Sequence, residues 1–225
     1  YPTDDVLNQV PEQIIFLLTA THPIAPKITD LKFFNKKTIH YNGYKALAHL
    51  HPNHFKHDIN RLAPELQNGI NFFLIRCTGF NATHDIGKSG ITDELILKLV
   101  EILEPHGEIL ITSERELPEK KIKYKLNIRK NDISHYIYSA SLFISDSTTM
   151  SCEAAVLGTP SVEFDDYFHE IKQMIELQEK YKLIHCFRTS EEEDFLNKIK
   201  DLLLQKDLKS KYMKRRKKLL DNTID

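Results

Sequence analysis

Four polar side chains in the second half of the chain have the types and the spacing that would bind a nucleoside diphosphate. Ser147, Thr148 and Thr149 stand where a helix is expected to begin, and Glu153 follows one turn later. Free backbone N–H groups and the positive end of the helix dipole make a helix start receptive to phosphate. Residues four apart project from one helix face, so Glu153 would lie below Thr149 and could hold ribose hydroxyls. The alternative is that Ser147 and Thr148 only cap the helix.

The flanking sequence predicts a strand, a short helix and a second strand around these side chains. The apolar segments 142–145 and 161–164 are the two strands. Gly158 takes the left-handed position that ends the helix, and Pro160 blocks its continuation. The hydroxyls therefore lie between the end of one buried strand and the first turn of a helix.

Strands that alternate with helices along the whole chain predict an α/β fold. The expected strands are 13–18, 38–41, 72–77, 108–112, 124–128, 142–145, 161–164 and 183–187. Besides the helix before Gly158, the expected helices are 92–103 with Thr92 as its cap, 133–140 capped by Asp132, 169–181, one that opens with the capping box Ser190-Glu-Glu-Glu193, and a basic final helix. This alternation is typical of a doubly wound, Rossmann-like parallel sheet.

Open parallel sheets bind ligands at the carboxyl ends of their strands, and two groups of polar residues fall there. Arg76 and the loop 78–89, which carries His84 and Asp85, would face Ser147 across the crevice. The loop is polar and contains glycines, which suits a diphosphate, although an ordinary surface loop has the same composition. Elsewhere at this edge, two acidic residues follow the strand 161–164, and paired acids in such a place can also be a helix N-terminus.

The segment that begins at Asp146 resembles the nucleotide-binding helix of the UDP-N-acetylglucosamine 2-epimerases, which carries the pattern Asp-Ser-Gly-Gly-…-Glu-Glu-Ala. Asp146, Ser147, Glu153 and Ala154 match this pattern, and the residues 148–149 replace its two glycines with threonines. A closer similarity is to domain of unknown function 354, an uncharacterised prokaryotic family with a glycosyltransferase-B type of fold. The segments that carry this similarity are 41–52, 75–76, 81–85, 109–114 and 149–160.

The resemblance implies that the chain is the C-terminal half of a glycosyltransferase-B-type fold. Residues 1–67 would then be a remnant of the N-terminal domain plus a linker, and residues 68–225 a Rossmann-like domain that binds a nucleotide sugar. A UDP-sugar is the implied ligand, and a glycosyltransferase or 2-epimerase of surface polysaccharide metabolism is the implied enzyme. The alternative is a non-catalytic binding or assembly module that retains the fold. The chain begins at Tyr1 rather than Met, and we expect either a fragment or a family member that has lost most of the N-terminal half.

The resemblance also bears on the residues of the site. The nucleotide-binding candidates are Arg76, Ser147, Thr148, Thr149 and Glu153. The catalytic carboxylates of the epimerases lie mostly in the N-terminal half, so the catalytic residues of this chain are unknown and the isolated chain is expected to be inactive. Weak catalytic candidates are His84 and Asp85, together with Asp165 and Asp166, whose loop touches the sugar in related folds.

The composition excludes several other classes of protein. The formal charge is −1, so no overall field recruits nucleic acid. The three cysteines are odd in number and far apart, which favours a reducing cytoplasm over a disulfide framework. The apolar run 14–18 is too short to cross a bilayer. No Gly-x-Gly-x-x-Gly, P-loop, nucleophile elbow or His-Glu-x-x-His motif occurs, and we expect no cofactor.

A histidine-rich segment and a basic segment each have two interpretations. Five of the eleven histidines fall within residues 40–57, but their spacing is unlike known zinc motifs, and we expect a solvated linker and no metal. The basic run 209–218 near the end is either a solvated helix face or a contact with an anionic membrane surface. Assembly into a homo-oligomer is left open.

Overall fold

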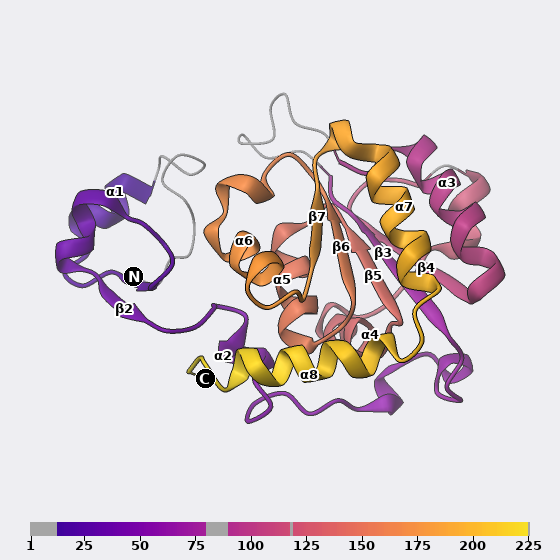
Figure 1. Ribbon diagram of the computed structural model, residues 1–225, viewed down its shortest axis with the longest axis horizontal. Coiled ribbons are helices and arrows are strands. Elements are labelled where there is room, and N and C mark those ends of the chain that lie inside the picture. Colours follow the sequence, from indigo (N-terminus) through magenta and orange to yellow (C-terminus); the bar gives the residue numbers. More distant parts are fainter. Residues whose placement is uncertain (1–12, 80–89, 118, 225) are drawn as a thin grey trace.

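A five-stranded parallel sheet forms the centre of the computed structural model, which describes residues 13–79, 90–117 and 119–224 (Figure 1). Its strands are β3 (Phe72–Cys77), β4 (Glu108–Ser113), β5 (Leu142–Ser145), β6 (Ser161–Phe164) and β7 (His185–Phe187). They lie in the order β4-β3-β5-β6-β7, and every pair is parallel. Four of the strands coincide closely with the predicted segments, and β7 is shorter than predicted.

Helices cover both faces of this sheet, as the sequence predicts for a doubly wound fold. On one face lie α3 (Asp93–Leu103) and α7 (Glu192–Leu203), and on the other α4 (Ile133–Ser139), α5 (Thr148–Leu157), α6 (Lys172–Glu179) and α8 (Leu208–Leu220). Side chains of β3 alternate between the two layers: Phe73 and Ile75 pack with α3, whereas Leu74 packs on the α5 side. A strand buried on both faces needs a continuous apolar run, which β3 has until Arg76.

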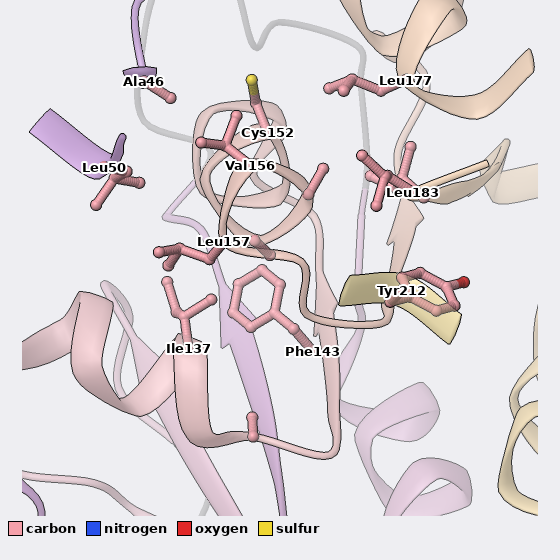
Figure 2. Packing of buried hydrophobic residues seen from close by; sticks show 14 of the residues in the cluster. Ala46, Leu50, Ile137, Phe143, Cys152, Val156, Leu157, Leu177, Leu183 and Tyr212 are labelled. Carbon is pink, nitrogen blue, oxygen red and sulfur yellow. The ribbon is translucent and has the colours of Figure 1, made fainter. Parts of the chain in front are cut away.

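Helix α5 is the central helix of its layer. Its residues from Ala154 to Leu157 are fully buried, and they pack against short helix α2 (Leu47–Leu50) as well as α4, α6 and α8. Figure 2 shows Val156 and Leu157 of α5 among the side chains of Leu50 from α2, Ile137 from α4, Tyr212 from α8, and Leu183, which precedes β7. The helix ends as predicted, with Gly158 left-handed at φ 74°. Because α5 is enclosed on all sides, the position of its first turn is set by the whole layer.

The basic run of α8 lies partly inside the molecule. The Lys209 Nζ donates to the Tyr138 carbonyl at 2.5 Å, at the end of α4, and the Arg216 Nε donates to the Val156 carbonyl at 2.7 Å, at the end of α5. Cations are favourable at helix C-termini, where carbonyls lack intrahelical partners. The expectation of a uniformly solvated face is therefore wrong for these two side chains, because α8 crosses two helix ends. Contact of the exposed lysines with a membrane stays a prediction.

The N-terminal segment forms a small unit of its own beside the main sheet (Figure 1). Helix α1 (Gln13–Thr19) precedes two short parallel strands, β1 (Ile24–Pro26) and β2 (Ile39–Tyr41). The predicted strand 13–18 is wrong, because this segment is α1. Its buried residues are Gln13 and Leu17, which are four apart and therefore share one helix face. A short apolar run cannot distinguish strand from helix by itself.

Four further predictions near α3 to α7 need correction. The segment 124–128 forms only a single bridge, from Lys125 to Ile111, because the polar residues Lys125 and Asn127 alternate with its apolar residues and do not suit burial in the sheet. Helix α6 is shorter than 169–181. Asp132 makes ion pairs at 2.8 Å with two arginines instead of capping α4. The predicted capping box is displaced, since the Arg188 N–H donates to Glu191 ahead of α7. Thr92, in contrast, caps α3 as predicted.

The linker after β2 runs along the layer that contains α5. The Tyr44 hydroxyl donates to Glu176 of α6 at 2.5 Å, and Asn42 exchanges hydrogen bonds with the last residues of the chain, at Asn222 and Ile224. Among the described residues, no group of three or more His, Cys, Asp and Glu side chains is placed to hold a metal ion. Within the same residues, no helix is long and apolar enough to cross a membrane.

Candidate functional site

The chain reverses its direction of travel across the sheet between β3 and β5. It passes from β3 to β4 on one side and then returns to place β5 on the other side of β3. At such a switch point the loops leave their strands in opposite directions, and a crevice opens at the carboxyl ends. The residues at these ends are Arg76 to Gly79 after β3 and Asp146 to Thr148 after β5. The predicted nucleotide-binding residues Arg76 and Ser147 are thus brought to the same switch point at the carboxyl edge of the sheet.

Asp146, at the end of β5, accepts hydrogen bonds from the backbone after β3 and before α3. Its Oδ1 accepts the Thr78 N–H at 2.7 Å, and its Oδ2 accepts the Ile91 N–H at 3.0 Å. The side chain is buried, and burial raises its pKa from 3.8 to about 6, while the two backbone N–H groups act in the opposite direction. Asp146 therefore positions the β3 loop against the start of α5. The sequence matched it to a family pattern but indicated no function for it.

A row of polar side chains crosses the carboxyl edge of the sheet beneath α5. The strand register aligns one residue from each strand, and aligned residues in neighbouring parallel strands face the same side. The row consists of Thr112, Arg76, Ser145, Glu163 and Cys186. The next aligned residues toward the amino ends of the three central strands are Leu74, Phe143 and Ser161, of which the first two belong to the apolar core. The polar character is therefore concentrated where the crevice lies.

Several buried polar atoms at this edge have no hydrogen-bond partner among the described residues. They are the Arg76 Nε, Thr112 Oγ1, Glu163 Oε1 and Asp165 Oδ2. Buried polar atoms nearly always have partners in native proteins, so each such atom calls for an explanation. Because these four atoms lie at one edge of the sheet, a polar ligand at this edge would find unused donors and acceptors.

Among the described residues, Arg76 forms an ion pair with a single carboxylate, and that carboxylate is exposed. The guanidinium forms an ion pair with Glu114 at the end of β4, and the other carboxylate oxygen of Glu114 accepts the Gly79 N–H at 3.3 Å. The Glu114 side chain is 55% exposed, whereas that of Arg76 is 17% exposed. An anion in the crevice would compete with Glu114 for Arg76. Glu114 was not among the predicted site residues, because nothing in its local sequence links it to Arg76.

The first turn of α5 presents its N–H groups without a side-chain cap. Ser147 occupies the N-cap position in an extended conformation, yet its hydroxyl makes no capping hydrogen bond. The first helical bond runs from the Ser151 N–H to the Ser147 carbonyl at 2.9 Å, so the N–H groups of Thr148, Thr149 and Met150 precede it. In this structure the alternative that Ser147 merely caps the helix does not hold. Thr149 is exposed, and Ser147 and Thr148 are half-buried.

Glu153 lies one turn below Thr149 and faces the linker. Its carboxylate is 3.5 Å from the Nε2 of His49 on α2, and its side chain is 17% exposed. Burial raises the pKa of Glu153, and His49 acts against this rise. His49 belongs to the histidine-rich segment that the sequence analysis interpreted as a linker. Nothing in the sequence indicated that His49 and Glu153 lie close together.

The acidic candidates after β6 are both used within the fold. Asp165 is fully buried, and its Oδ1 accepts the N–H groups of Tyr167 at 2.6 Å and Phe168 at 2.9 Å. Asp166 accepts from the Thr189 hydroxyl at 2.8 Å and thereby joins the loops after β6 and β7. The other two weak candidates, His84 and Asp85, lie outside the described residues. Their catalytic roles stay predictions.

A cavity of about 340 Å³ lies at the opposite end of the sheet. It is lined by Asn71, Ser141 and Lys209 together with apolar residues of α7 and α8. The polar groups here are already paired: Asn71 bonds to Ser141 and to the His106 carbonyl, and Lys209 bonds to the end of α4. Because the cavity is at the amino ends of the strands and these three polar side chains are paired, we place the candidate site at the carboxyl edge instead.

Similarity to known proteins identifies the fold of this chain but not its family. No family model matches the chain, and no curated protein matches it. The similarity to domain of unknown function 354 therefore has no support from a family model and stays a prediction.

Solved structures resemble the chain over most of its length. Os79 from O. sativa, in a complex that contains trichothecene, matches with a TM-score of 0.54 and 13% identity over 93% of this chain and 51% of its own. Spinosyn forosaminyltransferase SpnP matches with a TM-score of 0.50 and 15% identity over 94% of this chain and 52% of its own. A protein from Listeria monocytogenes assigned as a UDP-N-acetylglucosamine 2-epimerase gives 0.47 and 17% identity over 67% and 42%.

The chain therefore has a glycosyltransferase-B type of fold and spans about half the length of the structures it matches. The predicted fold class, an α/β doubly wound parallel sheet that corresponds to the C-terminal half of this type of fold, is confirmed. Identities of this size establish the fold alone.

Proposed function

We propose that this chain is the nucleotide-sugar-binding half of a glycosyltransferase-B-like enzyme, of transferase or 2-epimerase type, in surface polysaccharide metabolism. One observation carries the proposal: the uncapped first turn of α5 and Arg76 lie at the switch point between β3 and β5. A diphosphate there would accept N–H groups of the helix start and the Ser147 hydroxyl, and it would compete with Glu114 for Arg76.

The ligand we propose is a UDP-sugar. Arg76, Ser147, Thr148 and Thr149 would bind the diphosphate, and Glu153 the ribose hydroxyls. The pairing of Glu153 with His49 means that ribose would share the carboxylate with a neutral or a protonated imidazole. That SpnP, which matches with a TM-score of 0.50, is a forosaminyltransferase supports a sugar-transferring enzyme without deciding the nucleotide.

We further propose that residues 68–225 are the nucleotide-binding domain and that residues 1–67 are a remnant of an N-terminal domain with a linker. The unit around α1, β1 and β2 has a very small core, and large apolar side chains lie exposed on it. These include Ile15 at 66%, Leu18 at 64% and Phe33 at 69% exposure. An apolar face of this kind favours packing against further protein. On this proposal the sugar lacks an opposing wall, and the isolated chain turns over no nucleotide sugar.

Calorimetric titration with UDP, UDP-N-acetylglucosamine, ADP and pyrophosphate tests the proposal. We expect uridine nucleotides to bind at millimolar concentration or below. Ser147→Ala should weaken UDP and pyrophosphate alike by about 1.5–3 kcal/mol, the strength of one charge-assisted hydrogen bond. Glu153→Gln should weaken UDP by about 1–3 kcal/mol and leave pyrophosphate unchanged. The lysine-paired surface residue Asp221, changed to Asn, is a matched control that should affect neither ligand.

The outcomes separate the alternatives. Absence of uridine nucleotide binding refutes the nucleotide-sugar proposal, both for this chain and for a version extended at its N-terminus. Binding without turnover in the extended protein favours the non-catalytic module. Turnover by the isolated chain would show that all catalytic groups lie within these residues, and it would direct attention to His84, Asp85, Asp165 and Asp166.

A further inference from the structure

Two buried carboxyl groups lie beneath the first turns of α5. Glu163 is in β6, and Asp165 follows two residues later, so both side chains leave the chain on the same side. Neither has any exposed surface. Carboxylates are almost never fully buried without a positive partner, because the charged form loses its hydration. No lysine, arginine or histidine within the described residues forms an ion pair with either carboxyl.

Each carboxyl group uses one oxygen and leaves the other without a partner. The Glu163 Oε2 accepts the Ser151 hydroxyl of α5, and the Asp165 Oδ1 accepts two backbone N–H groups. Within the part of the chain that the structure describes, the Glu163 Oε1 and the Asp165 Oδ2 have no hydrogen-bond donor. The two side chains are nevertheless within hydrogen-bonding reach of one another. Two ionised carboxylates cannot bond, whereas one shared proton would satisfy both free oxygens at once.

We propose that Glu163 and Asp165 hold one proton between them, with the Glu163 Oε1–H donating to the Asp165 Oδ2, and that this proton maintains the position of α5. The asymmetry of the two environments assigns the proton. Glu163 is fully buried and accepts only one hydroxyl, which favours its neutral form, whereas the Asp165 Oδ1 accepts two backbone N–H groups. Neutral Glu163 acts as a positioning residue, because it connects the β6 edge to Ser151 in the second turn of α5.

The surrounding groups act in the same direction. The titratable groups that face Glu163 are Asp165, Asp146 at the end of β5, and the Cys186 thiol on β7. The pKa of Glu163 is raised well above its usual value, first by burial and then by Asp165. Burial and these carboxyls also raise the pKa of the Cys186 thiol. A second ionised carboxyl would thus add negative charge to a site that is already short of positive charge.

The shared proton has a consequence for ligand binding, which rests on the proposed function. The Ser147 to Met150 turn, where we propose the diphosphate, directly precedes Ser151. Loss of the proton would place a second negative charge beneath that turn and would weaken the bond from Ser151 to a neutral carboxyl. We expect diphosphate affinity to fall as pH rises through the pKa of the pair.

Infrared difference spectroscopy of the free protein tests the proton directly. The spectrum at pH 7 should contain the C=O band of a protonated carboxyl in a dry environment. The band should be lost in Glu163→Gln, whose amide reproduces both hydrogen bonds of a neutral glutamic acid, and also in Asp165→Asn. Glu108→Gln, at the exposed amino end of β4, is the control and should retain the band. Absence of the band from the wild type, or its persistence in Glu163→Gln, overturns the proposal.

Two further measurements cover the remaining outcomes. Because Gln reproduces the neutral acid, Glu163→Gln should fold, and a failure to fold at any pH from 5 to 8 also counts against the shared proton. Pyrophosphate titrations across the pH range test the link to binding: the ratio of wild-type Kd to Glu163→Gln Kd should rise roughly tenfold as the pair ionises. Pyrophosphate itself changes protonation with pH, but this change affects both proteins equally and cancels in the ratio. If the infrared band behaves as expected but pyrophosphate does not bind, the proton pair stands and the proposed function fails.

Discussion

Replacing Asp146 by alanine should destabilise the protein strongly, because this carboxylate accepts two backbone N–H groups in a buried position. The Thr78 and Ile91 N–H groups would both lose their acceptor. A buried donor without a partner costs about 1–3 kcal/mol, so we expect a loss of roughly 2–6 kcal/mol of unfolding free energy at pH 7. The exposed Asp221, which pairs only with Lys217, is the matched control, and Asp221→Ala should cost below about 0.5 kcal/mol.

The pH dependence of this cost has a definite sign. Burial raises the pKa of Asp146 from 3.8 to about 6 in the folded protein. A group with a raised folded pKa contributes stability below its unfolded pKa, and this contribution is lost as pH rises through the folded pKa. The rise corresponds to about 3 kcal/mol. The cost of Asp146→Ala should therefore be greater at pH 4 than at pH 7 by about that amount.

Urea unfolding of wild type and both variants at a series of pH values measures these quantities. The difference between wild type and Asp146→Ala isolates the contribution of this carboxyl from that of Glu163. If the cost of Asp146→Ala instead grows as pH rises from 4 to 7, the ionised carboxylate is the form that the fold prefers. The two N–H bonds would then outweigh burial, and our reasoning about this group would be wrong.

Two further predictions concern the contact of α5 with α8. Gly158→Ala should lower the free energy of unfolding by about 2–4 kcal/mol, since the residue has a positive φ of 74° and a Cβ would come within 2.8 Å of Arg216 Cδ. Calorimetric melting measures this loss, and an unchanged Tm would contradict the close approach of α8. Arg216→Met should leave the Val156 carbonyl without its donor and lower the free energy of unfolding by about 1–3 kcal/mol. Lys214→Met, at an exposed position of the same helix, should leave the stability unchanged. Equal effects of the two changes would refute the role of Arg216 in capping the end of α5.

The sequence by itself determined the order and type of most elements of the main sheet. The apolar run of β3, the cap at Thr92 and the stop at Gly158 are local signals, because each depends on residues within a few positions of one another. The hydroxyls and Glu153 on α5 were found for the same reason. In the N-terminal unit, the element type was predicted wrongly for α1, because this short apolar run has no clear periodicity.

Only the tertiary structure decided which groups pair across the site. Asp146 bonds to Thr78 and Ile91, and Glu153 pairs with His49 on the linker. These partners are distant in sequence, and they meet because five strands in a particular order bring their carboxyl ends together. A local pattern carries no information on which loop will lie opposite another. Chemical residue types can thus be recognised from sequence, whereas their partners, burial and protonation depend on the packed sheet and helices that surround them.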